Sequence, residues 1–283
     1  MAAHLERLDG RTALVTGATK GIGRAIAIRL ASLGADIVVT ASGRDPAGLD
    51  ETRRAVEAAG GRAHGLFVDL TDAAARADLV AQAGAAFGPV TILVNNAASA
   101  GAFAPLSKID LAARRNAFEV NVHAPVDLIQ AALPAMREAG WGRILNITSE
   151  TVSQPPAPYV TPAKFIHGLA AYGASKAALD RLTTGLAAEL HGSGIHVNAV
   201  KPYKICASEN ALALAHATMP RHPDWIEGVE MMAEASAILI AASLTGIIAS
   251  SREVLMMTQS PLHALDGRQV IGDAHTIPDL PPA

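Results

Sequence analysis

The chain has little that would mark it as a secreted or nucleic-acid-binding protein. Its 283 residues include a single cysteine, Cys206, so no disulfide can form within the chain, and we interpret Cys206 as a small packed residue. The net charge is −3, with both signs spread along the sequence, so no basic patch for nucleic acid is evident. Ten histidines are scattered without a metal-binding spacing, and we expect no catalytic metal.

An N-terminal signal core and a long apolar run are also missing. The first segment, MAAHLERLDG, is charged and does not have the apolar core of a secretion signal. The longest uncharged apolar run, residues 235–250, is short for a membrane span and predicts a buried helix followed by a strand. We therefore expect a cytoplasmic protein with no stable membrane insertion.

What the chain does contain is an alternation of short apolar runs with helical stretches. Half of its residues are hydrophobic but only 4% are aromatic, and small side chains suit close packing of helices on a sheet. The pattern predicts βαβ crossovers and one α/β domain over residues 1–283, with a parallel sheet covered on both faces. Six strands are expected, at residues 11–15, 36–40, 63–70, 90–97, 143–148 and 195–200. Helices are expected at residues 111–133 and 172–190.

The first expected strand runs directly into a glycine-rich turn, Thr16-Gly17-Ala18-Thr19-Lys20-Gly21-Ile22-Gly23. Glycines at these positions permit a tight turn and let backbone N–H groups approach a pyrophosphate. The helix that follows presents its positive dipole end to the same anion. In this strand–turn–helix context the turn predicts a dinucleotide site.

A second pattern, Tyr172-Gly173-Ala174-Ser175-Lys176, places a phenol and an ammonium four residues apart on a helix. The two side chains then project from the same face. A nearby positive charge stabilises a phenolate, so the pair is suited to exchanging a proton with an alcohol or a carbonyl.

Further segments fall, in order, where the short-chain dehydrogenase/reductase (SDR) family has its motifs, and residues 8–200 resemble that family. The matching segments are Thr16–Gly23, Val68-Asp69-Leu70, Asn95-Asn96-Ala97-Ala98, Asn121, Ser149, Tyr172 and Lys176. Ala98 replaces the last glycine of the family's third segment. The resemblance implies a single-domain Rossmann fold, with a doubly wound parallel sheet of about seven strands and helices on both faces.

The same resemblance implies roles for individual residues. Tyr172 would be the general acid or base, and Ser149 would hydrogen-bond the substrate oxygen. Lys176 would lower the Tyr172 pKa and hold the nicotinamide ribose, while Asn121 would order a water in a proton relay. Cofactor contacts are expected from Gly17, Thr19, Lys20, Gly21, Ile22, Gly23, Ser42, Arg44, Asp69, Leu70, Asn96, Ala97, Tyr172, Lys176, Pro202 and Ile205.

The end of the second expected strand bears on the choice of cofactor. An acidic residue there would bind both ribose hydroxyls of NAD, but the chain reads Val39-Thr40-Ala41-Ser42-Gly43-Arg44, and Asp45 comes later. Lys20, Ser42 and Arg44 could instead bind a 2′-phosphate. We expect NADP(H), with NAD(H) as the alternative.

The chain departs from the family in segments that we place near the substrate. Residues 151–168 are longer than usual and proline-rich; we interpret them as a wall or lid that carries Tyr159, Phe165 and His167, the alternative being a surface loop without substrate contact. After the sixth strand, in KPYKICAS, Tyr203 replaces the family's glycine, and residues 203–235 are expected on the substrate side. Residues 275–283 are expected to form a tail.

The leading functional prediction is an NADP(H)-dependent ketoreductase that interconverts a secondary alcohol and a ketone. Enoyl reduction or epimerisation on the same fold, and nucleotide sensing without turnover, stay open as alternatives. By analogy with the family we expect a small-molecule partner and a homo-oligomer, either a dimer or a homotetramer.

Overall fold

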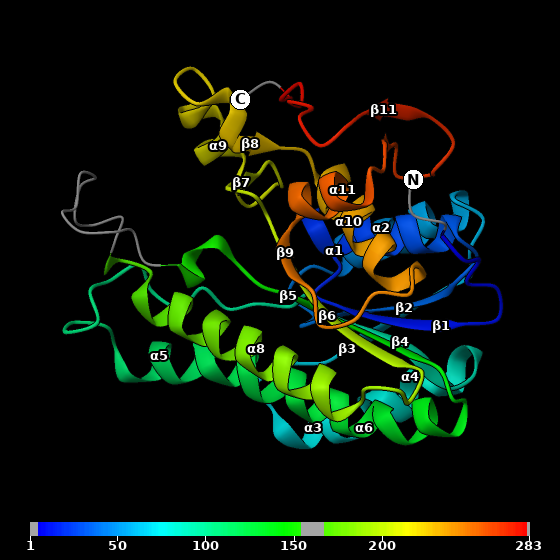
Figure 1. The fold of residues 1–283 in the computed structure, drawn as a ribbon. Coiled ribbons are helices and arrows are strands. Elements are labelled where there is room, and N and C mark those ends of the chain that lie inside the picture. Colours follow the sequence, from blue (N-terminus) through cyan, green and yellow to red (C-terminus); the bar gives the residue numbers. More distant parts are fainter. Residues whose placement is uncertain (1–4, 154–166, 282–283) are drawn as a thin grey trace.

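The computed structural model describes residues 5–153 and 167–281 and contains a central sheet of seven parallel strands (Figure 1). The strands are ordered β3-β2-β1-β4-β5-β6-β9, so the sheet is wound in both directions from β1 and β4. This confirms the predicted Rossmann architecture. The strands are β1 Thr12–Thr16, β2 Asp36–Ala41, β3 Ala63–Phe67, β4 Val90–Asn95, β5 Gly142–Ile147, β6 Ile195–Lys201 and β9 Ile248–Ser250.

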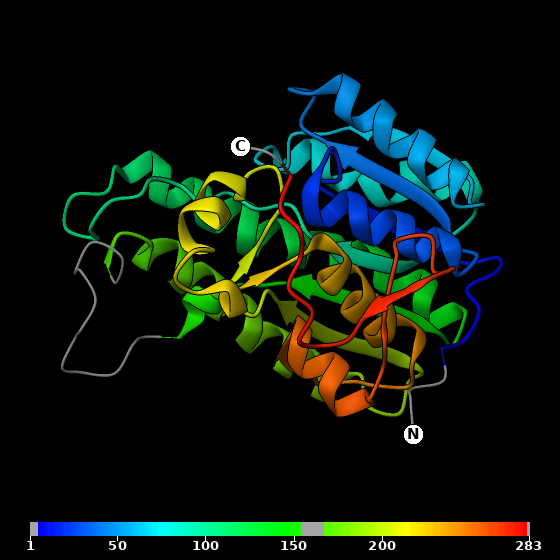
Figure 2. The same cartoon turned by 90° about the horizontal axis from the view of Figure 1, so that it is seen from above.

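Helices cover both faces of this sheet (Figures 1 and 2). One layer contains α1 Gly21–Ser32, α2 Pro46–Ala58, α10 Val229–Ala241 and α11 Ser251–Thr258. The opposite layer contains α3 Ala73–Ala77, α4 Leu79–Phe87, α5 Leu111–Phe118, α6 Ala124–Glu138 and α8 Ala170–Glu189. Each layer buries its own apolar core against the sheet.

The central strands read as continuous apolar runs because both of their faces are buried. Every residue of β1, β2, β4 and β5 is buried. Side chains alternate along a strand, so Ala13 and Val15 of β1 join the core beneath α1 and α10, while Leu14 joins the core beneath α4 and α6.

The expected helix over residues 111–133 is interrupted in the middle. A π-helical turn, Glu119–His123, joins α5 to α6, and the helical stretch continues to Glu138. Asn121 lies in this turn and is fully buried. Single π turns inside α-helices occur frequently at functional sites.

Beyond β6 the chain also forms small elements outside the central sheet. They are β7 Ile205–Cys206, α9 Leu212–Thr218, β8 Ile226–Glu227 and the antiparallel pair β10 Leu262–His263 and β11 Val270–Gly272. Strand β7 pairs in parallel with β8. Within the expected tail, Pro278 lies beside Gly228 at the start of α10. In the part of the chain described here, no helix has the length and apolarity needed to cross a membrane.

A buried ion pair ties the first helix to α10. Arg29 and Glu234 are 4% and 1% exposed, and Arg29 Nε lies 2.8 Å from Glu234 Oε2. We expect Glu234→Ala to lower the free energy of unfolding by about 3–5 kcal/mol, because it leaves the guanidinium buried without its partner. Urea unfolding would measure the change. Glu189→Ala, which breaks an exposed pair with Arg137, should cost less than about 1 kcal/mol; equal losses would contradict the prediction.

Candidate active site

The glycine turn is packed so tightly that side chains at two of its glycines would not fit. Gly17 has φ +66°, and an added Cβ would lie 2.7 Å from the Cα of Ala97. A Cβ on Gly23 would lie 2.4 Å from the Asn96 amide nitrogen. That amide donates hydrogen bonds to the carbonyls of Thr16 and Gly17, at 2.8 and 2.9 Å, and so holds the turn to the end of β4.

The start of α1 leaves backbone donors free for a ligand. Lys20 is the N-cap residue, but its side chain makes no capping hydrogen bond, and the first turn carries no acidic residue. The N–H groups of such a turn, together with the helix dipole, favour an anion. The turn therefore fits the pyrophosphate of a dinucleotide.

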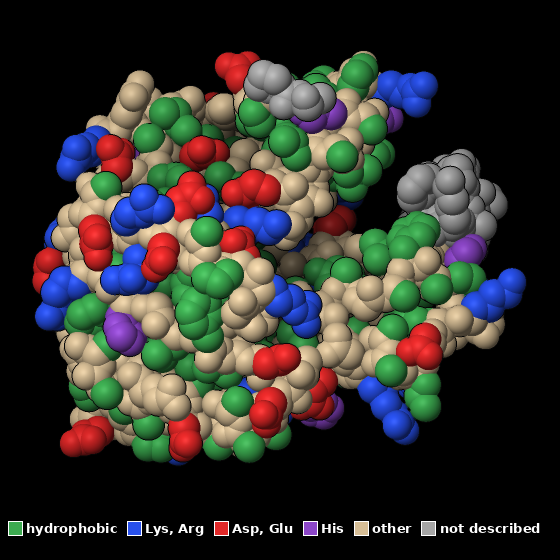
Figure 3. Space-filling view, turned by 180° about the vertical axis from the view of Figure 1, so that it is seen from behind, with side chains coloured by type: hydrophobic (Ala, Val, Ile, Leu, Met, Phe, Trp, Pro, Cys, Tyr) green, Lys and Arg blue, Asp and Glu red, His purple; other side chains and the backbone are tan. Residues whose placement is uncertain are grey.

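A cleft of about 610 Å³ opens over this turn, along the carboxyl ends of β1, β2 and β4, and the surface is hollowed on the side seen in Figure 3. Most of the predicted cofactor residues line it: Gly17, Thr19, Lys20, Gly21, Ile22, Gly23, Ser42, Arg44, Asp69, Leu70, Asn96 and Ala97. The cleft lies where open α/β sheets bind their ligands. Tyr172, Lys176, Pro202 and Ile205, also expected to contact the cofactor, are not among its lining residues.

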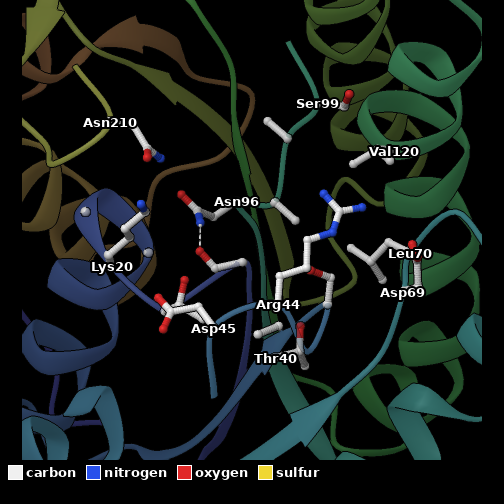
Figure 4. A pocket seen from close by; sticks show the side chains of 18 of the residues that line it. Lys20, Thr40, Arg44, Asp45, Asp69, Leu70, Asn96, Ser99, Val120 and Asn210 are labelled. Carbon is white, nitrogen blue, oxygen red and sulfur yellow. Dashed lines mark hydrogen bonds between the residues drawn. The ribbon is translucent and has the colours of Figure 1, made fainter. Parts of the chain in front are cut away.

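Several lining residues were missed by sequence reasoning. They are Thr40, Ala41, Asp45, Val68, Thr71, Ala98, Ser99, Asn116, Val120, Ser208 and Asn210. Ser208 and Asn210 come from the chain beyond β7. Figure 4 shows Asn210 on the opposite side of the cleft from Arg44. No local pattern marks Ser208 or Asn210, because only tertiary folding brings these two residues to the cleft.

Two cations line the cleft. Lys20 lies at the start of α1 and Arg44 follows β2, and Figure 4 shows the Arg44 guanidinium directed into the cavity. Asp45 also lines the cleft, but its carboxylate caps α2 by accepting a hydrogen bond from the Gly48 N–H at 2.9 Å. Asp69 accepts hydrogen bonds from Thr71, and these bonds, with the nearby charge of Arg44, lower the pKa of its carboxyl.

The structure brings Tyr172, Ser149 and Lys176 together. The phenol of Tyr172 is hydrogen-bonded to the side chain of Ser149. Ser149 follows β5 and is the N-cap of a short 3-10 turn, Glu150–Val152. The Lys176 ammonium lies 6.0 Å from the centroid of the Tyr172 ring and donates a hydrogen bond of 2.7 Å to the carbonyl of Ile147. These residues can share a proton with a substrate oxygen.

Asn121 links this group to the cofactor cleft. Its side-chain amide donates to the carbonyl of Ser99 and to the hydroxyl of Ser175, both at 2.9 Å. Its side-chain oxygen accepts from the Ser99 N–H at 2.8 Å. Ser175 in turn donates to the carbonyl of Tyr172. The amide thus orients both a cleft residue and helix α8, and its expected part in ordering a water stays a prediction.

Burial dominates the electrostatics of the pair on α8. It raises the pKa of the Tyr172 phenol above its ordinary value, and the hydrogen bond from Ser149 only partly offsets this. The net shift of the Tyr172 pKa is therefore upward, and the expectation that Lys176 lowers this pKa stays a prediction. Burial also lowers the pKa of Lys176 to about 8, which Asp180, one helical turn further on, partly opposes.

The lowered Lys176 pKa predicts how stability depends on pH. Between about 8 and the ordinary value of 10.5, the unfolded chain binds the lysine proton and the folded chain does not. The free energy of unfolding should therefore rise with pH in this window, by up to about 3 kcal/mol. Urea unfolding of the wild type and of Lys176→Met would isolate this term, since the variant should lose the rise. Lys108→Met, at an exposed lysine, should keep it; a rise that survives in Lys176→Met would contradict the prediction.

The predicted substrate residues are only partly described. Tyr159, Phe165 and most of the 151–168 segment lie outside the described residues. His167 is exposed, and the neighbouring Gly168 carbonyl accepts a hydrogen bond of 2.9 Å from Ala104. The Tyr203 ring lies against two cations, with the Arg252 guanidinium 4.8 Å and the Lys204 ammonium 5.6 Å from its centroid.

A doubly wound sheet, a glycine turn at the cleft and a Ser–Tyr–Lys group beside it define a class of nucleotide-dependent oxidoreductases. The sequence pattern of the short chain dehydrogenase family matches residues 11–214. The chain belongs to the short-chain dehydrogenase/reductase family.

Relatives illustrate how far this similarity extends. A short chain dehydrogenase of Pseudocercospora fijiensis is 37% identical over 77% of this chain and 67% of its own. The cis-4-hydroxycyclohexanecarboxylate dehydrogenase of Sinomonas cyclohexanicum is 38% identical over 70% of this chain and 74% of its own. A solved structure of a 3-oxoacyl (acyl-carrier-protein) reductase from Agrobacterium tumefaciens with NADP bound is 30% identical, with a TM-score of 0.75 over 86% of this chain and 93% of that one.

Proposed function

We propose that the protein is an NADP(H)-dependent oxidoreductase that interconverts a ketone and a secondary alcohol, with Tyr172 as the proton donor and acceptor. The observation that carries the proposal is the Tyr172 phenol, hydrogen-bonded to Ser149 and near the buried Lys176 ammonium. Asn121 connects this group to the cleft over the glycine turn.

The cofactor assignment rests on the residues of the cleft. The glycine turn and the start of α1 would hold the pyrophosphate, and Asp69 would lie at the adenine end. Lys20 and Arg44 would bind the 2′-phosphate, since both are cations that line the cleft. Asp45 is engaged in capping α2, which weakens the case for an acid that binds both ribose hydroxyls. When bound, the nicotinamide would supply the hydride.

The chain's own residues manage the proton and the substrate oxygen. Ser149 would hold the carbonyl oxygen by a hydrogen bond and stabilise the charge that develops there. Tyr172 would then donate its phenolic proton to that oxygen. Lys176 would hold the nicotinamide ribose and keep a positive charge beside the phenol.

The Tyr172 phenol is protonated at neutral pH, because burial raises its pKa above an already high ordinary value. It can therefore act as the proton donor when a ketone is reduced, whereas oxidation of an alcohol needs the phenolate as a base.

A turnover assay tests the proposal. Purified protein is mixed with NADPH or NADH and a panel of ketones, including ring ketones that carry a carboxylate, and the nicotinamide absorbance is followed. Oxidation of NADPH that depends on a ketone is the expected result. Cofactor binding without turnover of ketones, or of alcohols with NADP⁺, would overturn it and favour nucleotide sensing.

A further inference from the structure

Glu227 is a buried carboxylate that the proposed reaction does not use. Glu227 is the last residue of β8 and pairs with Cys206 of β7. The side chain is 0% exposed. Burying a carboxylate carries a large desolvation cost unless polar partners compensate it, so its contacts indicate what it holds in place.

Glu227 contacts both ends of one short segment, one end through its carboxylate and the other through its backbone. The Tyr203 N–H donates a hydrogen bond of 3.3 Å to Glu227 Oε2. The Ala207 N–H donates one of 2.8 Å to the Glu227 backbone carbonyl. The segment between them belongs to KPYKICAS, where the chain departs from its family. Ser208 follows at once, and both it and Asn210 line the cofactor cleft.

The carboxylate is fixed from the other side by the start of α11. The Ser251 hydroxyl lies 2.7 Å from each carboxylate oxygen. Arg252 Nε lies 3.7 Å from Oε2, and the Arg252 guanidinium also donates to the Ile226 carbonyl at 2.8 Å. The same guanidinium lies over the Tyr203 ring, so the segment is held by its backbone and by its aromatic side chain.

We propose that Glu227 is a positioning residue that fixes residues 203–207 and thereby places the next residue, Ser208, on the cofactor cleft. The inference rests on the proposed function of the cleft. A lining residue that is already in place lets the dinucleotide bind without an ordering cost, so Glu227 acts on cofactor affinity rather than on the chemical step.

The charge of Glu227 should affect the affinity of the protein for the cofactor. Burial raises its pKa to about 7, and the hydrogen bonds from Ser251 and Tyr203 and the charge of Arg252 only partly offset that. The charged and titratable side chains near it are the Arg252 guanidinium from α11 and the Cys206 thiol from β7, while Tyr203 meets it through its backbone N–H. The ionised form accepts stronger hydrogen bonds than the protonated form. The cofactor should therefore bind more tightly as the pH rises through about 7.

The test compares Glu227→Gln with Glu230→Gln, a nearby glutamate on the first turn of α10. The dissociation constant for NADPH is measured by fluorescence from about one pH unit below to one above the Glu227 pKa, and kcat and KM are measured beside it. We expect Glu227→Gln to raise the dissociation constant about tenfold at the upper end and to change kcat less than about threefold. Its ratio to the wild type should grow with pH, whereas the ratio for Glu230→Gln should stay near one. Because each variant is compared with the wild type at the same pH, the effect of cofactor ionisation on the dissociation constant cancels in the ratio.

A second variant keeps the proposal open to refutation if Glu227→Gln does not fold. Ser251→Ala removes a donor that lowers the Glu227 pKa, so the midpoint of the pH dependence should move to higher pH. An unchanged dissociation constant and midpoint in the folded variants would overturn the positioning role, as would a loss of kcat with unchanged cofactor affinity. Failure of the wild type to bind any nicotinamide cofactor would instead refute the proposed function of the cleft.

Discussion

Tyr172→Phe is expected to lower kcat by about 10²–10⁴-fold while the affinity for NADPH stays within about twofold. The substitution removes only the phenolic oxygen, which is hydrogen-bonded to Ser149 and is the proton donor in the proposed reaction. The ring that fills this half-buried position remains, so the fold should be kept. Steady-state kinetics with an active ketone, together with cofactor binding by fluorescence, would separate the two effects.

The control for this experiment removes a hydroxyl from the same helix away from the site. Thr184→Val lies on the exposed side of α8 and should leave kcat within about twofold of the wild type. A Tyr172→Phe protein that retained more than a tenth of the wild-type kcat would assign the proton transfer to another group, with Ser149 the nearest candidate.

The second large effect concerns the choice between the two nicotinamide cofactors. We expect the double variant Lys20→Ala/Arg44→Ala to raise the dissociation constant for NADPH by about 10²-fold or more, because each charged hydrogen bond to a phosphate contributes about 1.5–3 kcal/mol. The affinity for NADH should change less than about threefold. Fluorescence titration with both cofactors measures the two affinities.

Arg54→Ala serves as the matched control, since Arg54 is an exposed arginine on α2. It should leave the affinities for NADPH and NADH nearly unchanged, because salt screens the charge of an exposed arginine. Equal losses for NADPH and NADH in the double variant would place the two cations at the pyrophosphate rather than at a 2′-phosphate. The cofactor preference would then be decided by other residues of the cleft.

The alternation of apolar runs and helical stretches was enough to predict the parallel sheet. Strands buried on both faces leave a strong signal, and β1, β2, β4 and β5 are of this kind. The seventh strand, β9, has only three residues and is only partly buried, but the apolar run at residues 235–250 predicted a buried helix followed by a strand, as α10 and β9 are. Its place beside β6 depends on pairing across the chain, between Ala199 and Ile248 for example.

The glycine turn and the residues on α8 were predicted because each is a local pattern with a chemical reason. What the sequence did not reveal depends on burial and on distant contacts. The pKa of Tyr172 rises because its surroundings exclude water, which spacing along a helix does not report. Ser208 and Asn210 reach the cleft because β7 pairs with β8, and Glu227 meets Ser251 through the same folding of the chain.

The π-helical turn at Glu119–His123 means that inserting or deleting a residue between α5 and α6 would change the cleft. A π turn takes up one residue more than the regular repeat, so α5 and α6 are two helical segments out of phase with each other. Deleting one residue from the turn would restore a regular helix but rotate α5 by about 100° relative to α6. Leu128 would keep its place in the core, while Asn116 would turn away from the cleft that it lines. Changes of length in this helix are therefore restricted even where no side chain is altered.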